Sequence, residues 1–256
     1  MKFNRLPEDQ RQALNLYVKL MRAANVATNK IHRHLNEDNL TMSQFGVIEA
    51  LYHLGPLSQR LSYKTTSLTR GEPTMKTLHV LGICGSLRKH STNFGLLRYA
   101  QSHVPSGMEI ELIQLHEVPF YNADIQEPPA PVEKLKTSIE RADALLLACP
   151  EYNYSLAPAL KNALDWASRA PENHLLAGKP AAILGSGGGM GSARSQYHLR
   201  QVCVFLDLHP LNKPEVFSNA FDGSFDDEGN VVNPKIQKLI VEQLQALLSW
   251  ANTLGS

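Results

Sequence analysis

Residues 77–84 read TLHVLGIC, residues 144–149 read ALLLAC, and residues 179–185 read KPAAILG. Each run is short and nearly all apolar, which is typical of a strand that is buried on both faces of a sheet. Polar or glycine-rich loops and segments of helical periodicity follow these runs, and we expect helices at about 93–103, 157–169 and 193–205. This alternation of strand and helix predicts a parallel sheet with helices on both faces.

Two further strands and two further helices complete the pattern around these runs. We expect strands at 108–115 and near Val216, and helices at 132–141 and 234–254. Five such strands fit a doubly wound α/β fold with the flavodoxin-like strand order 2-1-3-4-5. In that order, ligands bind beyond the carboxyl ends of the strands, at the switch between the first and third strands.

The composition of the 256-residue chain is that of an ordinary globular protein, with 43% hydrophobic and 19% charged residues. Its net charge of +1 gives no global signal for nucleic acid or for acidic substrates. The charge is uneven, since residues 1–74 hold ten Lys and Arg against six Asp and Glu, whereas the remainder holds fifteen against eighteen. This asymmetry is consistent with two pieces, residues 1–74 and residues 75–256.

Targeting signals and cysteine spacing bear on the cellular compartment. The sequence shows neither a signal peptide nor an apolar run of about 18 residues, so we expect a soluble, cytoplasmic protein without a membrane span. The three cysteines, Cys84, Cys149 and Cys203, lie far apart in apolar runs and form no CxxC pair. This spacing disfavours a metal site or a redox dithiol and predicts buried, reduced thiols.

The loop after the first strand combines short hydrogen-bonding side chains with a fixed cation. Its sequence, GSLRKHSTN (85–93), provides Ser86, Arg88, Ser91, Thr92 and Asn93. Together with the N–H groups at the start of the next helix, these side chains predict a receptor for a terminal phosphate. The alternative is a polar loop in which Ser91 or Thr92 only caps the helix. The loop matches neither GxxxxGK[ST] nor GxGxxG, which disfavours an NTPase and a nicotinamide-storing Rossmann domain.

Two other loops leave the same edge of the predicted sheet. The loop after the third strand begins with a proline and continues with acidic, aromatic and amide side chains: Pro150, Glu151, Tyr152, Asn153 and Tyr154. Such groups can flank a planar ring and hydrogen-bond its polar edge, although a turn whose tyrosines cap the sheet is the alternative. The loop after the fourth strand, GSGGGMG (185–191), contains Ser186 and Gly187 and lets bare backbone approach a flat ligand. The three loops together predict a site for a planar, phosphate-bearing ligand.

Four motifs resemble the NADPH-dependent FMN reductase family, and most closely its bacterial chromate and quinone reductase branch. They are GSLRKHSTN (85–93), PEYNYS (150–155), LKNALDW (160–166) and ARSQYHLRQVCVFLD (193–207). The resemblance covers essentially all of residues 77–250, and it implies that FMN is the bound cofactor. The residues implied to hold it are Ser86, Arg88, Ser91, Thr92 and Asn93 at the phosphate, and Pro150, Glu151, Tyr152, Asn153, Tyr154, Ser186 and Gly187 at the ring. The loop after the fourth strand is richer in glycine here than in that branch. The resemblance therefore does not decide which residues of this loop contact the ring.

The resemblance also implies a reaction. NADPH or NADH passes a hydride to FMN and leaves, and a small acceptor then takes its place in a ping-pong cycle. Quinones, azo compounds, flavins and metal oxyanions such as chromate are the acceptor classes, and no side chain is singled out as catalytic. A flavodoxin-type electron carrier and a redox-sensing regulator that uses residues 1–74 are the alternatives. Carriers tend to be strongly acidic, whereas residues 75–256 carry a net charge of only −3.

The same branch joins an arginine, a tyrosine and a glutamate in a network between subunits. In this chain the three positions are Arg194, Tyr197 and Glu215. The resemblance therefore implies a homodimer or a homotetramer. The residues alone support only a charged helix face, because Arg194 and Tyr197 are three positions apart.

The N-terminal piece resembles a different family. Residues 40–59, LTMSQFGVIEALYHLGPLSQ, are similar to the start of a winged-helix regulator of the multiple-antibiotic-resistance (MarR) type, and we expect helices at about 7–36 and 43–54. The recognition helix of that family would begin near residues 68–74, but the first predicted strand already starts at Thr77. This interval is too short for a recognition helix and a β-wing, so we do not expect specific DNA binding.

Overall fold

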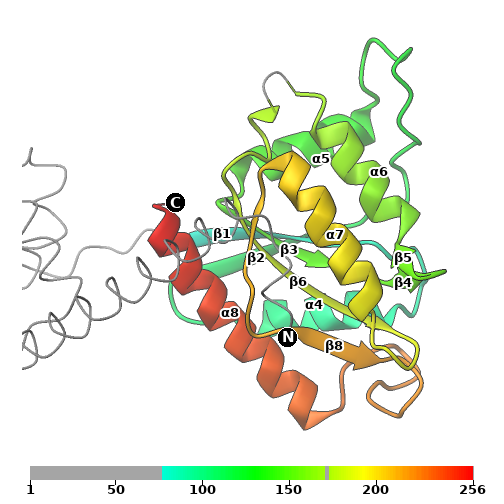
Figure 1. The fold of residues 1–256 in the computed structure, drawn as a ribbon, viewed down its shortest axis with the longest axis vertical. Coiled ribbons are helices and arrows are strands. Elements are labelled where there is room, and N and C mark those ends of the chain that lie inside the picture. The colour runs from blue at the N-terminus through cyan, green and yellow to red at the C-terminus, as the bar shows by residue number, and fades with distance from the viewer. Residues whose placement is uncertain (1–76, 171–172, 256) are drawn as a thin grey trace, which may run out of the picture. The chain divides into compact units, whose positions relative to one another are not determined.

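A computed structural model describes residues 77–170 and 173–255 of the chain. Within these residues strands and helices alternate, as Figure 1 shows, and six of the strands form one parallel sheet with helices on both of its faces. The helices predicted before residue 75 and the resemblance of residues 40–59 to a MarR-type regulator lie outside the described residues, so they stay predictions.

The main sheet has the order β2-β1-β3-β6-β7, and β8 also pairs with β6. The strands are β1 (Leu78–Cys84), β2 (Met108–Ile113), β3 (Ala144–Ala148), β6 (Pro180–Gly187), β7 (His209–Pro210) and β8 (Val216–Asn219). All of their pairings are parallel, for example Val80 with Ala144 and Leu145 with Ala181. The predicted flavodoxin-like order is therefore confirmed.

The last strand position differs from the prediction of one short strand near Val216. Two short strands share this position, since β7 pairs with the first half of β6 and β8 pairs with the second half. Pro210 and Pro214 lie at the end of β7 and between the two strands. Proline has no N–H to donate to a sheet, which explains why the ladder is interrupted there.

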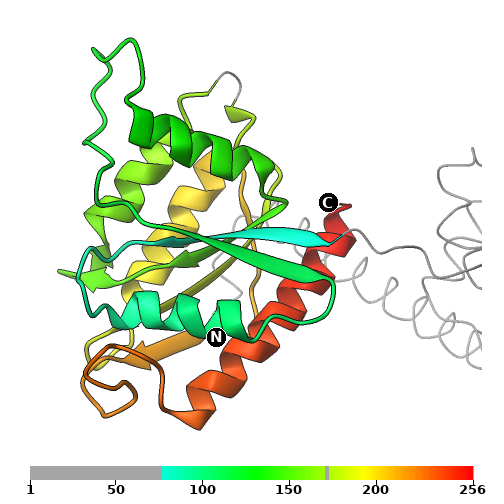
Figure 2. The ribbon, with the colours of Figure 1, turned by 180° about the vertical axis from the view of Figure 1, so that it is seen from behind.

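Two layers of helices cover the sheet (Figures 1 and 2). The helices are α4 (Thr92–Ser102), α5 (Ala130–Arg141), α6 (Pro158–Ala167), α7 (Ala193–Leu206) and α8 (Pro234–Leu254). Alternate strand residues point to opposite faces, so Val80 packs in the core with α4 and α8, whereas Leu81 packs in the core with α5, α6 and α7. Both faces of the central strands are buried, which is why their sequences read as continuous apolar runs.

A small hairpin follows β3, where the sequence predicts only a loop. Its strands are β4 (Glu151–Tyr152) and β5 (Ser155–Leu156), and Asn153 and Tyr154 form the turn with φ angles of 50° and 67°. Two consecutive left-handed residues are typical of the tight turns that join hairpin strands. Asparagine adopts this conformation readily, but for a bulky residue such as tyrosine it is uncommon.

The three cysteines are free and buried, as predicted. Burial raises the pKa of the Cys84 thiol to about 11 and the pKa values of the Cys149 and Cys203 thiols to about 12. They are therefore neutral thiols near pH 7. Among residues 77–170 and 173–255, no group of His, Cys, Asp and Glu is placed to hold a metal ion. No helix in these ranges combines the length and hydropathy that a bilayer span needs.

Candidate functional site

The loops that follow β1, β3 and β6 meet at the carboxyl edge of the sheet. Gly85 shows how closely the first two approach, because a Cβ atom added there would lie 2.9 Å from Cδ of Pro150. The first and third loops are joined by hydrogen bonds between Asn93 and Ser186. The structure thus brings the three sequence-predicted loops together.

The start of α4 has open hydrogen-bond donors. Ser91 is the N-cap, and its buried Oγ accepts a hydrogen bond from the backbone N–H of Phe94 at 3.2 Å. Within the described part of the chain, the backbone N–H groups of Thr92 and Asn93 find no acceptor. The capping role of Ser91 is confirmed, and two donors at the positive end of the helix dipole remain for an anion.

Arg88 and Ser86 lie in the loop that leads to this helix. Ser86 is buried, and its Oγ accepts a hydrogen bond from the backbone N–H of Arg88 at 3.4 Å. The Arg88 side chain is exposed and has no hydrogen-bond or ion-pair partner among residues 77–170 and 173–255. Its guanidinium is therefore free to bind a phosphate with forked geometry.

The Asn93 side chain joins two of the three loops. Its side chain donates from Nδ2 to the carbonyl of Ser186 and accepts from the N–H of Ser186, both at 2.9 Å. The amide thus ties the start of α4 to the end of β6 instead of pointing freely at a ligand. Ser186 Oγ is buried and has no hydrogen-bond partner among the described residues.

The Glu151 side chain packs against the start of α7. Its carboxylate accepts hydrogen bonds from Arg194 Nε at 2.6 Å and from the backbone N–H groups of Arg194 and Ser195 at 3.1 and 3.4 Å. The side chain is only 6% exposed, so it caps the N-terminus of α7 and is not free to line a ring with its carboxylate. The hydrogen bond to Glu151 raises the pKa of the Arg194 guanidinium.

Arg194 in turn fixes the hairpin. Its guanidinium carbon lies 3.6 Å from the centroid of the Tyr154 ring, a cation–π contact that helps to hold this tyrosine in its uncommon backbone conformation. Tyr152 and Tyr154 are exposed at the same edge, together with Asn153. The pair of Glu151 and Arg194 therefore positions the ring of Tyr154, and Tyr152 of the same hairpin lies beside the loop that follows β1.

The glycine-rich loop after β6 has two kinds of glycine. A Cβ atom at Gly187 would lie 3.0 Å from the backbone nitrogen of Ser192, so this position is tightly packed. At Gly188 and Gly189 an added Cβ would meet no atom within 4 Å. The bare backbone of these two residues is accessible, as the predicted approach to a flat ligand requires.

The three predicted interface residues are only partly together within one chain. Tyr197 donates from its hydroxyl to Glu215 Oε1 at 3.3 Å, and Lys213 forms an ion pair with the same carboxylate. The hydrogen bond from Lys213 is the main reason that the pKa of Glu215 is lowered. Arg194 does not join them, because its side chain is paired with Glu151.

An apolar cavity of about 460 Å³ borders the loop after β1 and the hairpin. One of its walls was not predicted from the sequence: the segment after β2, which contributes His116, Pro119 and Phe120. Asn162 on α6 holds this segment by donating to the carbonyl of Pro119 at 2.9 Å. The sequence offered one signal for this wall, its position after β2, because every loop that follows a parallel strand begins at this edge.

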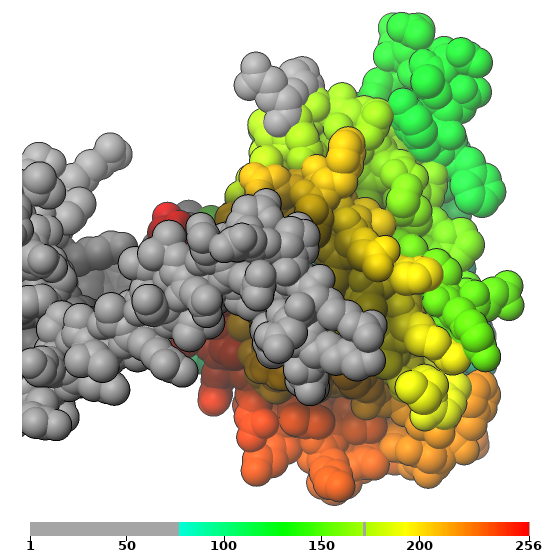
Figure 3. Space-filling view, viewed as in Figure 1, coloured from blue at the N-terminus to red at the C-terminus, as the bar shows by residue number. Residues whose placement is uncertain are grey.

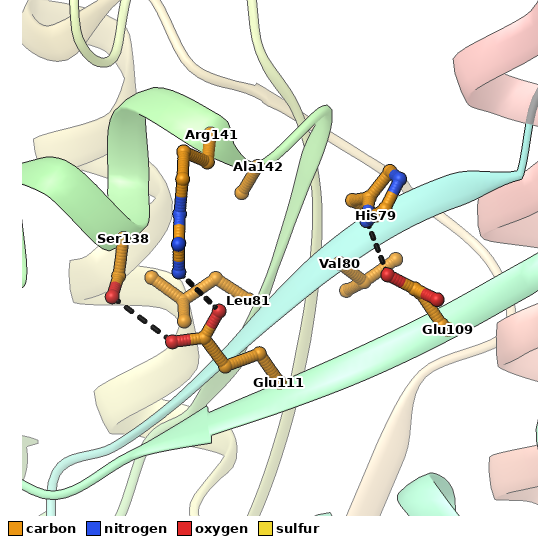
Figure 4. Close-up of a pocket in the computed structure, with 8 residues that line it drawn as sticks. All are labelled: His79, Val80, Leu81, Glu109, Glu111, Ser138, Arg141 and Ala142. Carbon is orange, nitrogen blue, oxygen red and sulfur yellow. Dashed lines mark hydrogen bonds and ion pairs between the residues drawn. The ribbon is translucent and has the colours of Figure 1, made fainter.

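A second cavity, of about 320 Å³, opens beside β1, β2 and α5 and is shown in Figure 4. Its charged groups already satisfy one another, because Glu111 accepts from Arg141 and from Ser138 at 3.0 Å and His79 pairs with Glu109. These contacts brace the edge strand β2 against α5 and β1. We assign no ligand to this cavity.

A doubly wound parallel sheet with this strand order defines a flavodoxin-like fold, and the open N–H groups, the free arginine and the unpaired buried hydroxyl lie at the edge where such folds bind ligands. The family model for NADPH-dependent FMN reductases matches residues 78–222, and the chain belongs to this family. This match begins at Leu78 and leaves residues 1–77 outside it.

Several characterised proteins are similar to this chain. An NAD(P)H-dependent FMN reductase of Pseudomonas aeruginosa is 54% identical over 181 residues, which are 69% of this chain and 97% of that protein. A quinone reductase of Escherichia coli is 41% identical over 175 residues, 66% of this chain and 93% of that protein. Among solved structures, the flavoenzyme FerB of Paracoccus denitrificans, an NAD(P)H:acceptor oxidoreductase, has a TM-score of 0.64 and 31% identity and covers 70% of this chain and 100% of its own.

Proposed function

We propose that this protein is an FMN-dependent reductase that oxidises NAD(P)H and reduces quinones or similar small acceptors. The observation that carries the proposal is the loop after β1, which bears the unpaired Arg88 side chain and leads to the open N–H groups of Thr92 and Asn93 at the start of α4. The unpaired Ser186 Oγ and the accessible glycine backbone nearby fit a polar, flat ligand. Family membership and the two reductase relatives support the same chemistry.

Different residues would bind the two ends of FMN. Arg88, Ser86 and the start of α4 would hold the FMN phosphate, whereas the hairpin tyrosines and the Gly188–Gly189 backbone would border the ring. FMN, when bound, supplies the chemistry by accepting a hydride from NAD(P)H and delivering electrons to the acceptor. The pair of Glu151 and Arg194 orients the hairpin, and Asn93 fixes the distance between the two ends of the site. Azo compounds, free flavins and chromate are further acceptor classes that we propose.

The first test is the spectrum and turnover of the purified protein. We expect about one FMN per chain, a yellow colour, and steady oxidation of NADPH or NADH when a quinone is supplied. Flavin content from the absorption spectrum and the rate at 340 nm measure the two parts separately. A protein that stays colourless with added FMN would exclude the proposal, and a yellow protein without multiple turnovers would favour the electron-carrier alternative.

We also propose that the protein assembles as a homodimer or homotetramer through the outer face of α7. Tyr197, Val204 and Phe205 lie on this face at helical spacing, and Val204 and Phe205 are 82% and 78% exposed. Figure 3 shows the yellow of α7 at the surface of the molecule. Large apolar side chains that gather on one exposed helix face are typical of interfaces between protein chains.

The assembly proposal is tested by placing charge on this face. In the double variant Val204→Glu, Phe205→Glu we expect a smaller assembly by light scattering, with unchanged circular dichroism, because two carboxylates would be desolvated in the interface. Val232→Glu changes an exposed apolar residue outside α7 and should leave the mass unchanged. A wild-type protein with the mass of one chain, or a double variant that assembles normally, would argue against this interface.

For residues 1–74 we propose a truncated MarR-like segment that does not read DNA sequence. The support is the resemblance of residues 40–59 and the short interval before Leu78, where β1 begins. The reductase proposal does not depend on this segment, because the family match lies wholly beyond it.

A further inference from the structure

The loop that follows β8 is braced internally by one carboxylate. Asp226 Oδ1 accepts hydrogen bonds from the backbone N–H groups of Glu228 and Asn230 at 3.0 and 2.8 Å, and Asp226 Oδ2 accepts from Asn230 Nδ2 at 3.0 Å. The hydrogen bond from the Asn230 side chain is the main reason that the pKa of Asp226 is lowered, so the loop favours the ionised carboxylate. We call residues 226–230 the clasp loop.

The clasp loop packs against the start of α4, and Figure 2 shows it in orange beside this helix. Gly229 has a φ angle of 77°, and a Cβ atom added to it would lie 3.0 Å from the carbonyl oxygens of His90 and Ser91. A Cβ atom added to Gly95 would clash with the carbonyl oxygen of Gly229. Because neither glycine leaves room for a side chain, the backbone of the clasp loop lies directly against the N-cap and the first turn of α4.

Side chains attach the clasp loop to the helix at two points. Arg98, in the second turn of α4, donates from Nε and Nη2 to Asn230 Oδ1 at 3.1 and 2.6 Å and from Nη2 to the carbonyl oxygen of Glu228 at 3.1 Å. His90, which directly precedes the N-cap, places Nδ1 2.7 Å from the carboxylate of Glu228. The loop is therefore attached both before the first residue of α4 and one turn beyond its first turn.

The donors that the site offers to an anion lie between these two points of attachment. They are the backbone N–H groups of Thr92 and Asn93, which have no acceptor within the described part of the chain. Asn93 also joins this turn to Ser186 at the end of β6, where the buried Ser186 Oγ lacks a partner among the same residues. Two separate segments thus hold the start of α4, and donors that are fixed before a ligand arrives bind it with a smaller entropic cost.

We propose that the clasp loop positions the start of α4 for the phosphate of FMN, with Arg98 and Asn230 as positioning residues that act through the helix. The inference rests on the proposed reductase function. The group that responds to the clasp loop is the phosphate monoester, because the donors it holds are N–H groups at a helix N-terminus. The hairpin and the Gly188–Gly189 backbone, which would border the ring, belong to other segments, so binding of the ring should not depend on the clasp loop.

The experiment compares Asn230→Ala with the wild-type protein and uses riboflavin as the flavin that lacks the phosphate. In fluorescence titrations of the apoprotein we expect the dissociation constant of FMN to rise about tenfold, whereas that of riboflavin changes by less than about twofold. Arg98→Gln removes the other half of the same contact and should show the same selective loss. Asn122→Ala is the matched control, because Asn122 is an exposed asparagine that accepts from the N–H of Asp124 in a different loop.

Inorganic phosphate gives a second readout that needs no flavin. In NMR spectra of the ¹⁵N-labelled apoprotein, phosphate should shift the amide signals of Thr92 and Asn93. Asn230→Ala should require about tenfold more phosphate for the same shift, while Asn122→Ala should behave like the wild-type protein.

Three results would overturn the inference. Equal losses of affinity for FMN and riboflavin would show that the clasp loop only stabilises the fold, and unchanged FMN affinity in both Asn230→Ala and Arg98→Gln would separate it from the phosphate site. Failure of both variants to fold would make the loop a requirement for folding and would reject the positioning role. Failure of the reductase proposal itself looks different, because the wild-type protein would then bind neither flavin.

Discussion

Replacement of Arg88 by alanine is expected to weaken FMN binding about ten- to a hundredfold. The loss of one charge-assisted hydrogen bond to phosphate costs roughly 1.5–3 kcal/mol, which corresponds to this range in the dissociation constant. The effect should be large because Arg88 has no competing partner among residues 77–170 and 173–255, so its guanidinium is available to the ligand. Flavin fluorescence titration of the apoprotein measures the change directly.

Arg141→Ala is the matched control for this prediction. Arg141 is an arginine of α5 whose side chain is 65% exposed and pairs with Glu111 at 3.0 Å. An exposed ion pair of this kind contributes only about 0–1 kcal/mol to stability, and the control should bind FMN like the wild-type protein. If Arg88→Ala and Arg141→Ala bind FMN equally well, Arg88 is an ordinary surface charge, and the phosphate is held by the backbone donors of α4 alone.

The fold was predictable from the sequence because local signals and topology agree. The central strands β1, β3 and β6 read as apolar runs since both of their faces are buried, and the alternation with helices restricts the sheet to a parallel order. The position of the three loops at one edge then follows from topology alone. The hairpin β4–β5 gave no comparable signal, because its strands have two residues each and its turn carries Asn153–Tyr154 in place of a glycine pair.

The partners of individual site residues were not predictable in this way. Glu151 pairs with Arg194 over a separation of 43 positions, and Asn93 pairs with Ser186 over 93 positions. Which polar group meets which depends on how α4 and α7 pack against the sheet, and no local pattern encodes that. The position of the three loops was therefore predictable, whereas the hydrogen-bond partners of the Glu151 and Asn93 side chains were not. That these two residues contact the ligand stays a prediction.

Gly95→Ala is expected to destabilise the protein, against the trend for its residue type. Gly95 lies in the first turns of α4, where replacement of glycine by alanine ordinarily stabilises a helix by about 0.5–1 kcal/mol. Here an added Cβ would lie 1.7 Å from the carbonyl oxygen of Gly229 and 2.8 Å from its carbonyl carbon. Both are backbone atoms, so either α4 or the loop at Gly229 has to move, and such overpacking costs about 1–3 kcal/mol or more.

The steric cost at Gly95 exceeds the gain in helix propensity. The residue that Gly95 contacts, Gly229, also touches the N-cap of α4 beside the proposed phosphate site. Gly229 packs against Ser91, since a Cβ at Gly229 would lie 3.0 Å from the carbonyl oxygen of Ser91. Displacing the loop at Gly229 therefore disturbs the N-cap of α4 as well as the core, and FMN affinity should fall together with stability. For a net loss of about 2 kcal/mol, the melting temperature of the apoprotein should drop by roughly 4–8 °C in calorimetry.

Gly188→Ala is the control, because its Cβ would meet no atom within 4 Å and its melting temperature should be close to that of the wild-type protein. A Gly95→Ala protein that melts at or above the wild-type temperature would show that helix propensity outweighs the close contact, and that the start of α4 is not buttressed by the loop at Gly229.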